Sequence, residues 1–225
     1  MGTVIGDILP LAVGVALSPI PIIAVILMLF SKNAHSTSLG FLVGWFLGVT
    51  VVATAIVFIA NPAQQATGGE TSPMSAIVHI LLGVLLLVAA YRNWKKRPKL
   101  GEQVEMPKWM SSIESMSAGK AFGLGALLSG VNPKNLALII AAGVAIAAAG
   151  LTTSQTIVAL VIFILVACVS VAAPVIVYLV MGSKAESMLN NWKAWLTQNN
   201  ATVMTILLLV FGVIVLSKGP GAWIG

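Results

Sequence analysis

Residues 125–134 read Gly-Ala-Leu-Leu-Ser-Gly-Val-Asn-Pro-Lys, and they place an amide, a proline and a cation inside a long apolar run. A proline at position 133 removes one helical hydrogen bond and clashes with the carbonyl four residues earlier, and Gly130 weakens the helix further. A lysine near mid-membrane costs about 2.5–3.5 kcal/mol on insertion scales, so we expect Lys134 to face protein or water rather than lipid. The stretch therefore predicts a broken membrane helix with Lys134 as the first candidate site residue.

The composition of the whole chain is that of an integral membrane protein. Of its 225 residues, 59% are hydrophobic and 8% are charged, whereas soluble domains have roughly 25% charged residues. The single cysteine, Cys168, cannot form an internal disulfide. The net charge of +6 comes from basic residues that flank apolar stretches, a pattern set by membrane topology. We therefore expect membrane lipids, and not nucleic acid, to be the partners of this chain.

The apolar stretches predict an all-α fold with six transmembrane helices. They cover residues 4–30, 38–60, 73–91, 119–149, 155–181 and 201–216. The first and fourth are about 40 Å and about 46 Å long at 1.5 Å per residue, which exceeds a hydrocarbon core of about 30 Å. Both contain a proline near the middle, so helices 1 and 4 are expected to be broken.

The basic residues predict the orientation in the cell membrane. Of the 12 Lys and Arg residues, ten fall in loops on one predicted side, Lys218 falls on the other side and Lys134 lies within a span. Because basic loops stay in the cytoplasm, both termini should be extracytoplasmic and the basic, amphipathic loop 92–118 should be cytoplasmic. Residues 184–198 carry apolar side chains at helical spacing, including Trp192 and Trp195, and predict a helix lying on the inner surface.

Two short segments repeat. Residues 14–20 read Gly-Val-Ala-Leu-Ser-Pro-Ile, residues 125–131 read Gly-Ala-Leu-Leu-Ser-Gly-Val, and a proline follows each segment closely. Three spans per half would give the halves opposite orientations, so the pattern predicts two inverted three-helix repeats, as in many transporters. The first repeat is residues 1–91 and the second is residues 119–225, joined by the loop 92–118.

The two predicted breaks form the candidate substrate site. Helix N-termini at the breaks and the Lys134 ammonium would all favour an anion. The candidate residues are Ser18, Pro19, Pro21, Ser129, Asn132, Pro133 and Lys134. Two alternatives remain open at this stage. The breaks could be architecture alone, because neighbouring helices can satisfy freed backbone groups, or Lys134 could lie at the inner interface with residues 119–131 on the membrane surface.

Three further features have two interpretations each. His79 and Asp7 could couple transport to protons, but a lone span histidine is commonly bonded to a neighbouring helix, and Asp7 suits a helix start at the outer interface. Gly44 and Gly48 form a Gly-x-x-x-Gly pair that lets another helix approach closely. That helix could belong to the same chain or to a second copy in a homodimer.

With Pro-Ile-Pro at residues 19–21 and Asn-Pro-Lys at residues 132–134, the chain resembles the lysine exporter (LysE) superfamily, and within it the glycopeptidolipid- or sulfolipid-addressing branch. The resemblance implies a plasma-membrane exporter, often dimeric, that moves complex glycolipids toward the cell surface. Amino-acid exporters of this superfamily have Gly-x-x-x-Gly-Asp in the second span, whereas residues 44–49 here read Gly-Trp-Phe-Leu-Gly-Val. Because a cationic amino acid needs a buried anion, the missing carboxylate favours an anionic lipid or glycolipid as substrate.

The function expected from the sequence is therefore export or flipping of an anionic lipid or glycolipid. The alternatives are a small-solute exporter for amino acids or ions, and an accessory scaffold for a separate lipid-export machine. The sequence has no metal-spaced His or carboxylate cluster, no Gly-rich phosphate loop and no plausible Ser-His-Asp set. We accordingly expect no enzyme activity, no cofactor and no metal.

Overall fold

The structure is a computed structural model, and it describes residues 1–65, 73–95, 97 and 108–218. These residues form helices joined by short turns, with no strand among them. The helices are α1 (Gly2–Ala16), α2 (Pro19–Leu29), α3 (Ala34–Gln65), α4 (Pro73–Lys95), η1 (Lys108–Ser115), α5 (Ala118–Gly130), α6 (Pro133–Ala148), α7 (Thr153–Met181), η2 (Gly182–Ala185) and α8 (Glu186–Ser217). Part of the predicted cytoplasmic loop 92–118, namely residues 96 and 98–107, lies outside the described residues.

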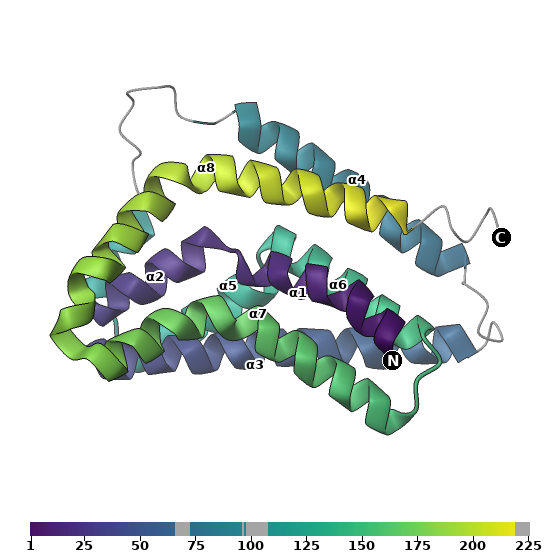
Figure 1. Cartoon of the computed structure of the whole chain (residues 1–225), viewed down its shortest axis with the longest axis horizontal. Helices are drawn as coiled ribbons and strands as arrows, with labels where there is room; N and C mark the ends of the chain where they lie inside the picture. The colour runs from purple at the N-terminus through teal and green to yellow at the C-terminus, as the bar shows by residue number, and fades with distance from the viewer. Residues whose placement is uncertain (66–72, 96, 98–107, 219–225) are drawn as a thin grey trace.

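Several helices are long and apolar enough to cross a membrane. Three stretches meet this criterion alone, Ala34–Ala60, Ala76–Lys95 and Thr153–Ser217, and the count reaches five if each of two bent helix pairs is one span. The longest stretch contains both α7 and α8, which meet at one end of the molecule and run back along it (Figure 1). The all-helical membrane fold is confirmed, and the count of six spans in two repeats stays a prediction.

Both predicted breaks are present. The α1–α2 pair bends by 50° and the α5–α6 pair bends by 62°. Each second helix begins with a proline, Pro19 in α2 and Pro133 in α6. Proline suits this first position because it needs no hydrogen-bond acceptor for an N–H and its φ is already helical. The prolines therefore begin new half-helices at the breaks.

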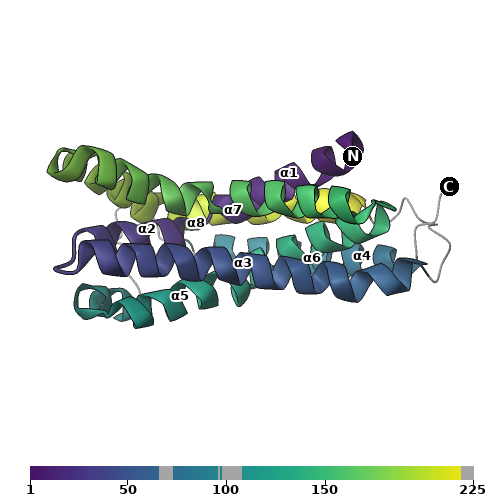
Figure 2. The same ribbon diagram turned by 90° about the horizontal axis from the view of Figure 1, so that it is seen from below.

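Helix α5 lies along the first half of α3 (Figure 2). The two backbones approach so closely that a Cβ on Gly44 would lie 2.0 Å from the Phe122 carbonyl oxygen, and one on Gly40 would lie 2.7 Å from that of Ala118. A Cβ on Gly48 would likewise lie 2.0 Å from Ser129 Oγ. The Gly44–Gly48 pair thus packs against α5 of the same chain and is not available as a dimer seam. This packing also argues against the alternative in which residues 119–131 lie on the membrane surface.

Helix α8 differs from the prediction. We expected a separate surface helix over residues 184–198 and a short span over residues 201–216, but one continuous helix covers Glu186–Ser217. Residues 186–211 contain neither glycine nor proline, so nothing in the sequence ends the helix between the two segments. The first turns of α8 run at an angle to the remainder (Figure 1), so the change of direction occurs without a break.

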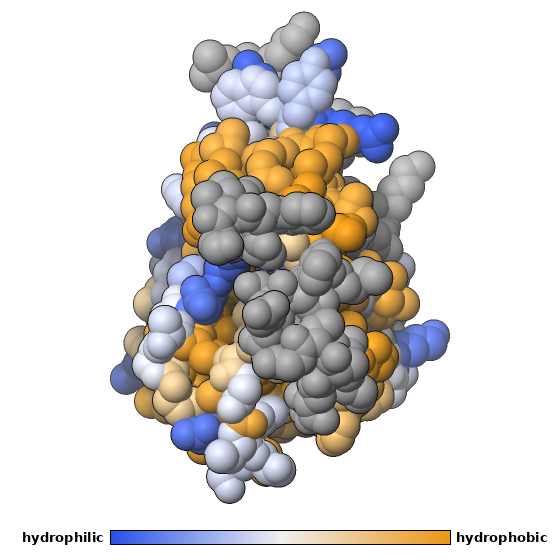
Figure 3. All heavy atoms as spheres, turned by 90° about the vertical axis from the view of Figure 1, so that its right-hand side faces the viewer, coloured by the Kyte–Doolittle hydropathy of each residue, from blue (hydrophilic) through white to orange (hydrophobic). Residues whose placement is uncertain are grey.

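The outside of the bundle is apolar. Phe58 and Ile59 are each 73% exposed, and Val180 is 79% exposed. Figure 3 views the bundle from one end and shows hydrophobic side chains between hydrophilic ones that lie at several points around its outline. Exposed apolar area of this extent indicates contact with a membrane. Asp7 and Lys218 form a salt bridge of 2.7 Å, which places both ends of the described chain on one side; that this side is extracytoplasmic stays a prediction.

Candidate functional site

The two helix breaks meet at Lys134. Its Nζ donates hydrogen bonds to the Gly14 carbonyl oxygen at 2.6 Å and to Ser18 Oγ at 2.8 Å, with a longer contact of 3.5 Å to the Leu17 carbonyl oxygen. All three acceptors belong to the last turn of α1 or to the α1–α2 break. One side chain from the second break therefore holds the first break in place.

The start of α6 directs Lys134 to this position. Asn132 caps α6, and its Oδ1 accepts a hydrogen bond from the Lys134 backbone N–H at 3.0 Å. Pro133 follows as the first helical residue, and Lys134 is the second. A cation at a helix N-terminus is unfavourable, whereas the carbonyl end of a helix attracts one. The lysine side chain therefore gains by extending from the N-terminus of α6 to the C-terminus of α1.

The sequence of α1 and α2 explains why acceptors are free there. In a continuous helix the Val15 and Leu17 carbonyls would accept hydrogen bonds from residues 19 and 21, but both residues are prolines and have no N–H. The Val15 carbonyl instead accepts a bond from Ser18 Oγ at 2.8 Å, and the Leu17 carbonyl faces the Lys134 ammonium. The two prolines thus create acceptors that side chains must satisfy.

The Ser18 backbone N–H adds to this pattern. It donates to the Ala16 carbonyl oxygen at 2.8 Å rather than to the Gly14 carbonyl, which would be its partner in a regular helix. The Gly14 carbonyl is therefore available to the Lys134 ammonium. The Ala16 carbonyl also accepts a hydrogen bond from the Ser170 hydroxyl of α7, so a third helix is attached to the same break.

Asn135 belongs to this cluster, although it was not among the site residues predicted from the sequence. Its Oδ1 lies 2.9 Å from Ser18 Oγ, and its Nδ2 donates to the Leu128 carbonyl oxygen of α5 at 3.3 Å. Because a hydroxyl has one hydrogen, Ser18 donates to either Asn135 or Val15 while accepting from Lys134. The signal that could have identified Asn135 is its position beside Lys134, as a second polar residue inside the same apolar span.

The cluster is buried and contains no acid. Exposed fractions are 2% for Ser18, 3% for Lys134 and 0% for Asn135. Within the described ranges, no salt bridge joins Lys134 to a carboxylate, and its hydrogen-bond acceptors are neutral oxygens. An ammonium held in this way lacks an anionic partner. A negatively charged group would therefore complete the site.

The other predicted site residues lie around this cluster with different roles. Ser129 is fully buried, but its Oγ donates within its own helix to the Ala126 carbonyl oxygen at 2.9 Å. Pro19 and Pro21 are buried in the first turn of α2, whereas Pro133 is exposed. The structure therefore brings Ser18 and Lys134 into direct contact and leaves Ser129 outside the bonding of the ammonium.

The two candidates for proton coupling lie outside the hydrogen-bond partners of Lys134. Asp7 is bonded to Lys218 and its side chain is 53% exposed, as expected for a carboxylate near a helix start. His79 is a buried residue of α4. Proton coupling through either residue stays a hypothesis.

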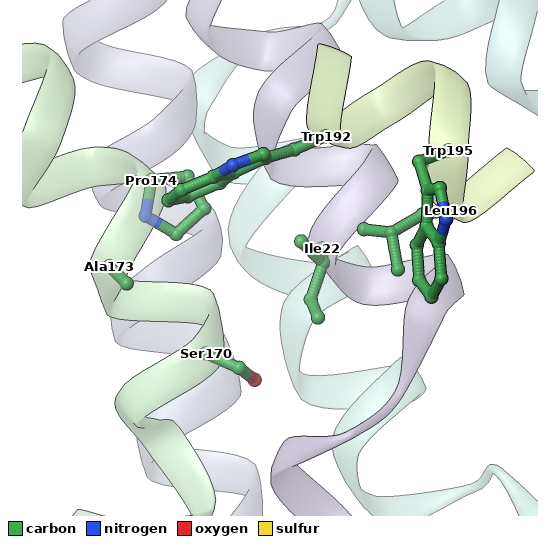
Figure 4. A pocket seen from close by; sticks show the side chains of 7 residues that line it. All are labelled: Ile22, Ser170, Ala173, Pro174, Trp192, Trp195 and Leu196. Carbon is green, nitrogen blue, oxygen red and sulfur yellow. The ribbon is translucent and has the colours of Figure 1, made fainter. Parts of the chain in front are cut away.

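A pocket of about 340 Å³ lies between α2, α7 and the first part of α8. Ile22, Ser170 and Pro174 line it together with the indole rings of Trp192 and Trp195. Figure 4 shows both indoles at the end formed by α8 and Ser170 at the opposite end. Since the Ser170 hydroxyl is bonded to the Ala16 carbonyl, the pocket reaches the α1–α2 break.

The comparisons with known proteins address the identity of the chain. A search of curated proteins and a search of solved structures found no match. The family described as Sap, sulfolipid-1-addressing protein, matches residues 8–221. This span includes both helix breaks, the Lys134 cluster and the pocket. It agrees with the sulfolipid-addressing branch expected from the sequence. The chain therefore belongs to the sulfolipid-1-addressing protein family.

Proposed function

We propose that the protein exports or flips an anionic lipid or glycolipid toward the cell surface. The family name connects the chain with lipid addressing. The observation that carries the proposal is the Lys134 ammonium, which is buried at the junction of two bent helices and is held by neutral oxygens. A phosphate, sulfate or carboxylate headgroup would supply the missing anion at this point.

The proposed step is an exchange of acceptors. Hydrogen bonds between an ammonium and an anionic oxygen are roughly twice as strong as bonds between neutral groups, so a headgroup would compete well with the Gly14 and Leu17 carbonyls. When Lys134 turns to the headgroup, the α1–α2 break loses the contact that holds it. Because the same lysine lies in the first turn of α6, movement at one break would be passed to the other, as alternating access around a fixed site requires.

The buried polar cluster is also the feature that favours a transporter over a scaffold. An accessory scaffold needs only apolar packing among its helices, whereas this chain keeps Ser18, Lys134 and Asn135 buried together. A small-solute exporter could use the same ammonium for a free anion. The pocket beside the break, which is apolar in its lining, favours a substrate with a hydrocarbon part.

The experiment is a flipping assay in vesicles with a fluorescent phosphatidylglycerol, and with the matching phosphatidylcholine for comparison. Lys134→Met keeps an apolar chain of similar length without the charge, and it should reduce phosphatidylglycerol flipping to the rate of protein-free vesicles. Lys120→Met is the matched control because Lys120 is exposed on α5, and it should flip at the wild-type rate.

Two results would change the proposal. Full flipping by a folded Lys134→Met variant would overturn it. A wild-type protein that flips no lipid in vesicles, yet is needed for lipid export in cells, would support the scaffold instead. Lys134→Arg separates charge from shape: it should retain part of the activity if charge alone matters, because arginine keeps the charge but not the compact ammonium.

A further inference from the structure

We propose that the pocket between α2, α7 and α8 holds one acyl chain of an anionic membrane lipid, with the lipid headgroup beside Lys193. This inference rests on the proposed function and gives it a loading position, where the lipid binds before its headgroup reaches Lys134. The occupant follows from four features of the pocket: its lining, its size, its mouth and the charge beside that mouth.

The lining suits hydrocarbon. Ile22, Ala173, Pro174 and Leu196 contribute apolar side chains to it. The Ser170 hydroxyl also lies there, but its hydrogen is already donated to the Ala16 carbonyl. At about 340 Å³, the pocket is at the small end of the roughly 300–1,000 Å³ of ligand pockets. It therefore suits a segment of one chain rather than a whole lipid.

We take the α8 end of the pocket as its mouth, because the residues there are typical of a membrane interface. Trp192 and Trp195 lie at the α8 end, and the two residues are 38% and 57% exposed. Tryptophans concentrate at the headgroup level of bilayers, where one side of the ring is apolar and the other is hydrated. A chain that enters between these rings would leave its headgroup at the same level.

A positive charge lies next to these tryptophans in the sequence, because Lys193 follows Trp192 in α8. The Lys193 Nζ lies 5.5 Å from the centroid of the Phe30 ring, at the end of α2. Lys184 is exposed two turns earlier, close to the start of α8. Glu186 is the acidic residue of α8, and no salt bridge joins it to either lysine. The charge beside the mouth therefore complements an anionic headgroup rather than a zwitterionic one.

The far end of the pocket explains how loading could reach the Lys134 cluster. Ser170 connects that end to the Ala16 carbonyl, and the next carbonyl, that of Leu17, faces the Lys134 ammonium. A chain that displaces the Ser170 side chain would free the Ala16 carbonyl within the same break. The pocket and the polar cluster thus meet at a single turn of the backbone.

The test is native mass spectrometry of the full chain released from nanodiscs that contain equal amounts of palmitoyl-oleoyl phosphatidylglycerol and phosphatidylcholine. The wild type should retain phosphatidylglycerol in preference. Ala173→Phe fills the pocket and should abolish retention, and the smaller Ala173→Leu should reduce it if the phenylalanine variant does not fold. Ala55→Phe is the matched control, because Ala55 is exposed on α3, and it should retain lipid as the wild type does.

Lys193→Met should lower the preference for phosphatidylglycerol about fivefold, which corresponds to about 1 kcal/mol for one basic residue near an anionic surface. Equal retention by the wild type and a folded Ala173 variant would overturn the pocket, even if Lys134→Met still blocks flipping and leaves the proposed function intact. Retention that depends on Ala173, with flipping insensitive to Lys134, would leave the pocket standing and refute the proposed function. Retention without preference between the two lipids would overturn the anionic occupant.

Discussion

Reversal of the charge at Lys134 tests the arrangement of the cluster most directly. The ammonium donates to the Gly14 carbonyl at 2.6 Å and to Ser18 Oγ at 2.8 Å. In Lys134→Glu, a carboxylate would face carbonyl oxygens that can only accept hydrogen bonds. A buried charge without a partner costs about 3–5 kcal/mol. A membrane protein of ordinary stability would not accumulate in folded form with that loss.

The comparison variant is Lys134→Met. For this variant, the stability lost with the hydrogen bonds of the ammonium and the stability gained by removing a buried charge nearly cancel. Two hydrogen bonds from a charged donor contribute about 1.5–3 kcal/mol each, and their loss destabilises the junction of the two breaks. Removal of the buried ammonium also eliminates a desolvation cost of several kcal/mol. We therefore expect a net change within about 2 kcal/mol of zero for this variant.

The assay is the amount of monodisperse protein extracted from membranes, together with its thermal unfolding in mild detergent. We expect the wild type and Lys134→Met to give similar amounts of protein and similar unfolding temperatures. Lys134→Glu should give much lower values of both. If Lys134→Glu accumulates and unfolds like Lys134→Met, the side chain at position 134 is not enclosed by the carbonyls of α1, and the exchange step proposed above has no basis.

Three further predictions follow from the packing and the orientation. Gly44→Ala should destabilise the fold by about 1–3 kcal/mol, because its Cβ would lie 2.0 Å from an α5 carbonyl oxygen. Gly123→Ala should not destabilise it, because a Cβ at that position meets no atom within 4 Å. Thermal unfolding in detergent measures both effects. Asp7→Asn should change stability by less than about 1 kcal/mol by the same measurement, because exposed ion pairs contribute little. In intact cells, an impermeant thiol reagent should label a cysteine placed at Thr152 and should not label one placed at Arg97; the reverse would invert the orientation.

Much of the Lys134 junction could be predicted because local rules decide it. Pro133 and Asn132 are a helix start in sequence as in structure, since a cap and a first-turn proline act within a few residues. The burial of Lys134 also followed from its position in an apolar run. By contrast, the identity of its acceptors depended on packing between α1 and α6, which no local pattern of either helix contains.

Other features lay beyond sequence reasoning for the same physical reason. The pairing of Asp7 with Lys218 joins residues that are 211 positions apart, and the pocket forms where three helices meet. The continuity of α8 was open to prediction, because no glycine or proline interrupts residues 186–211. The change from an amphipathic pattern in residues 184–198 to an apolar one in residues 201–216 suggested two helices. The backbone propensity of the same residues allows one continuous helix.

The prolines at the first break and the lysine at the second depend on each other. Unpaired carbonyls cost several kcal/mol each in hydrocarbon. Because Pro19 and Pro21 have no N–H, the Val15 and Leu17 carbonyls lack the backbone donor four residues later. Straightening α1 and α2 would therefore not pair these carbonyls, whereas a change of side-chain or water donor can satisfy them. A transport cycle built on this junction would alter which side chain, water or headgroup satisfies the carbonyls as the α1–α2 break is released and held again.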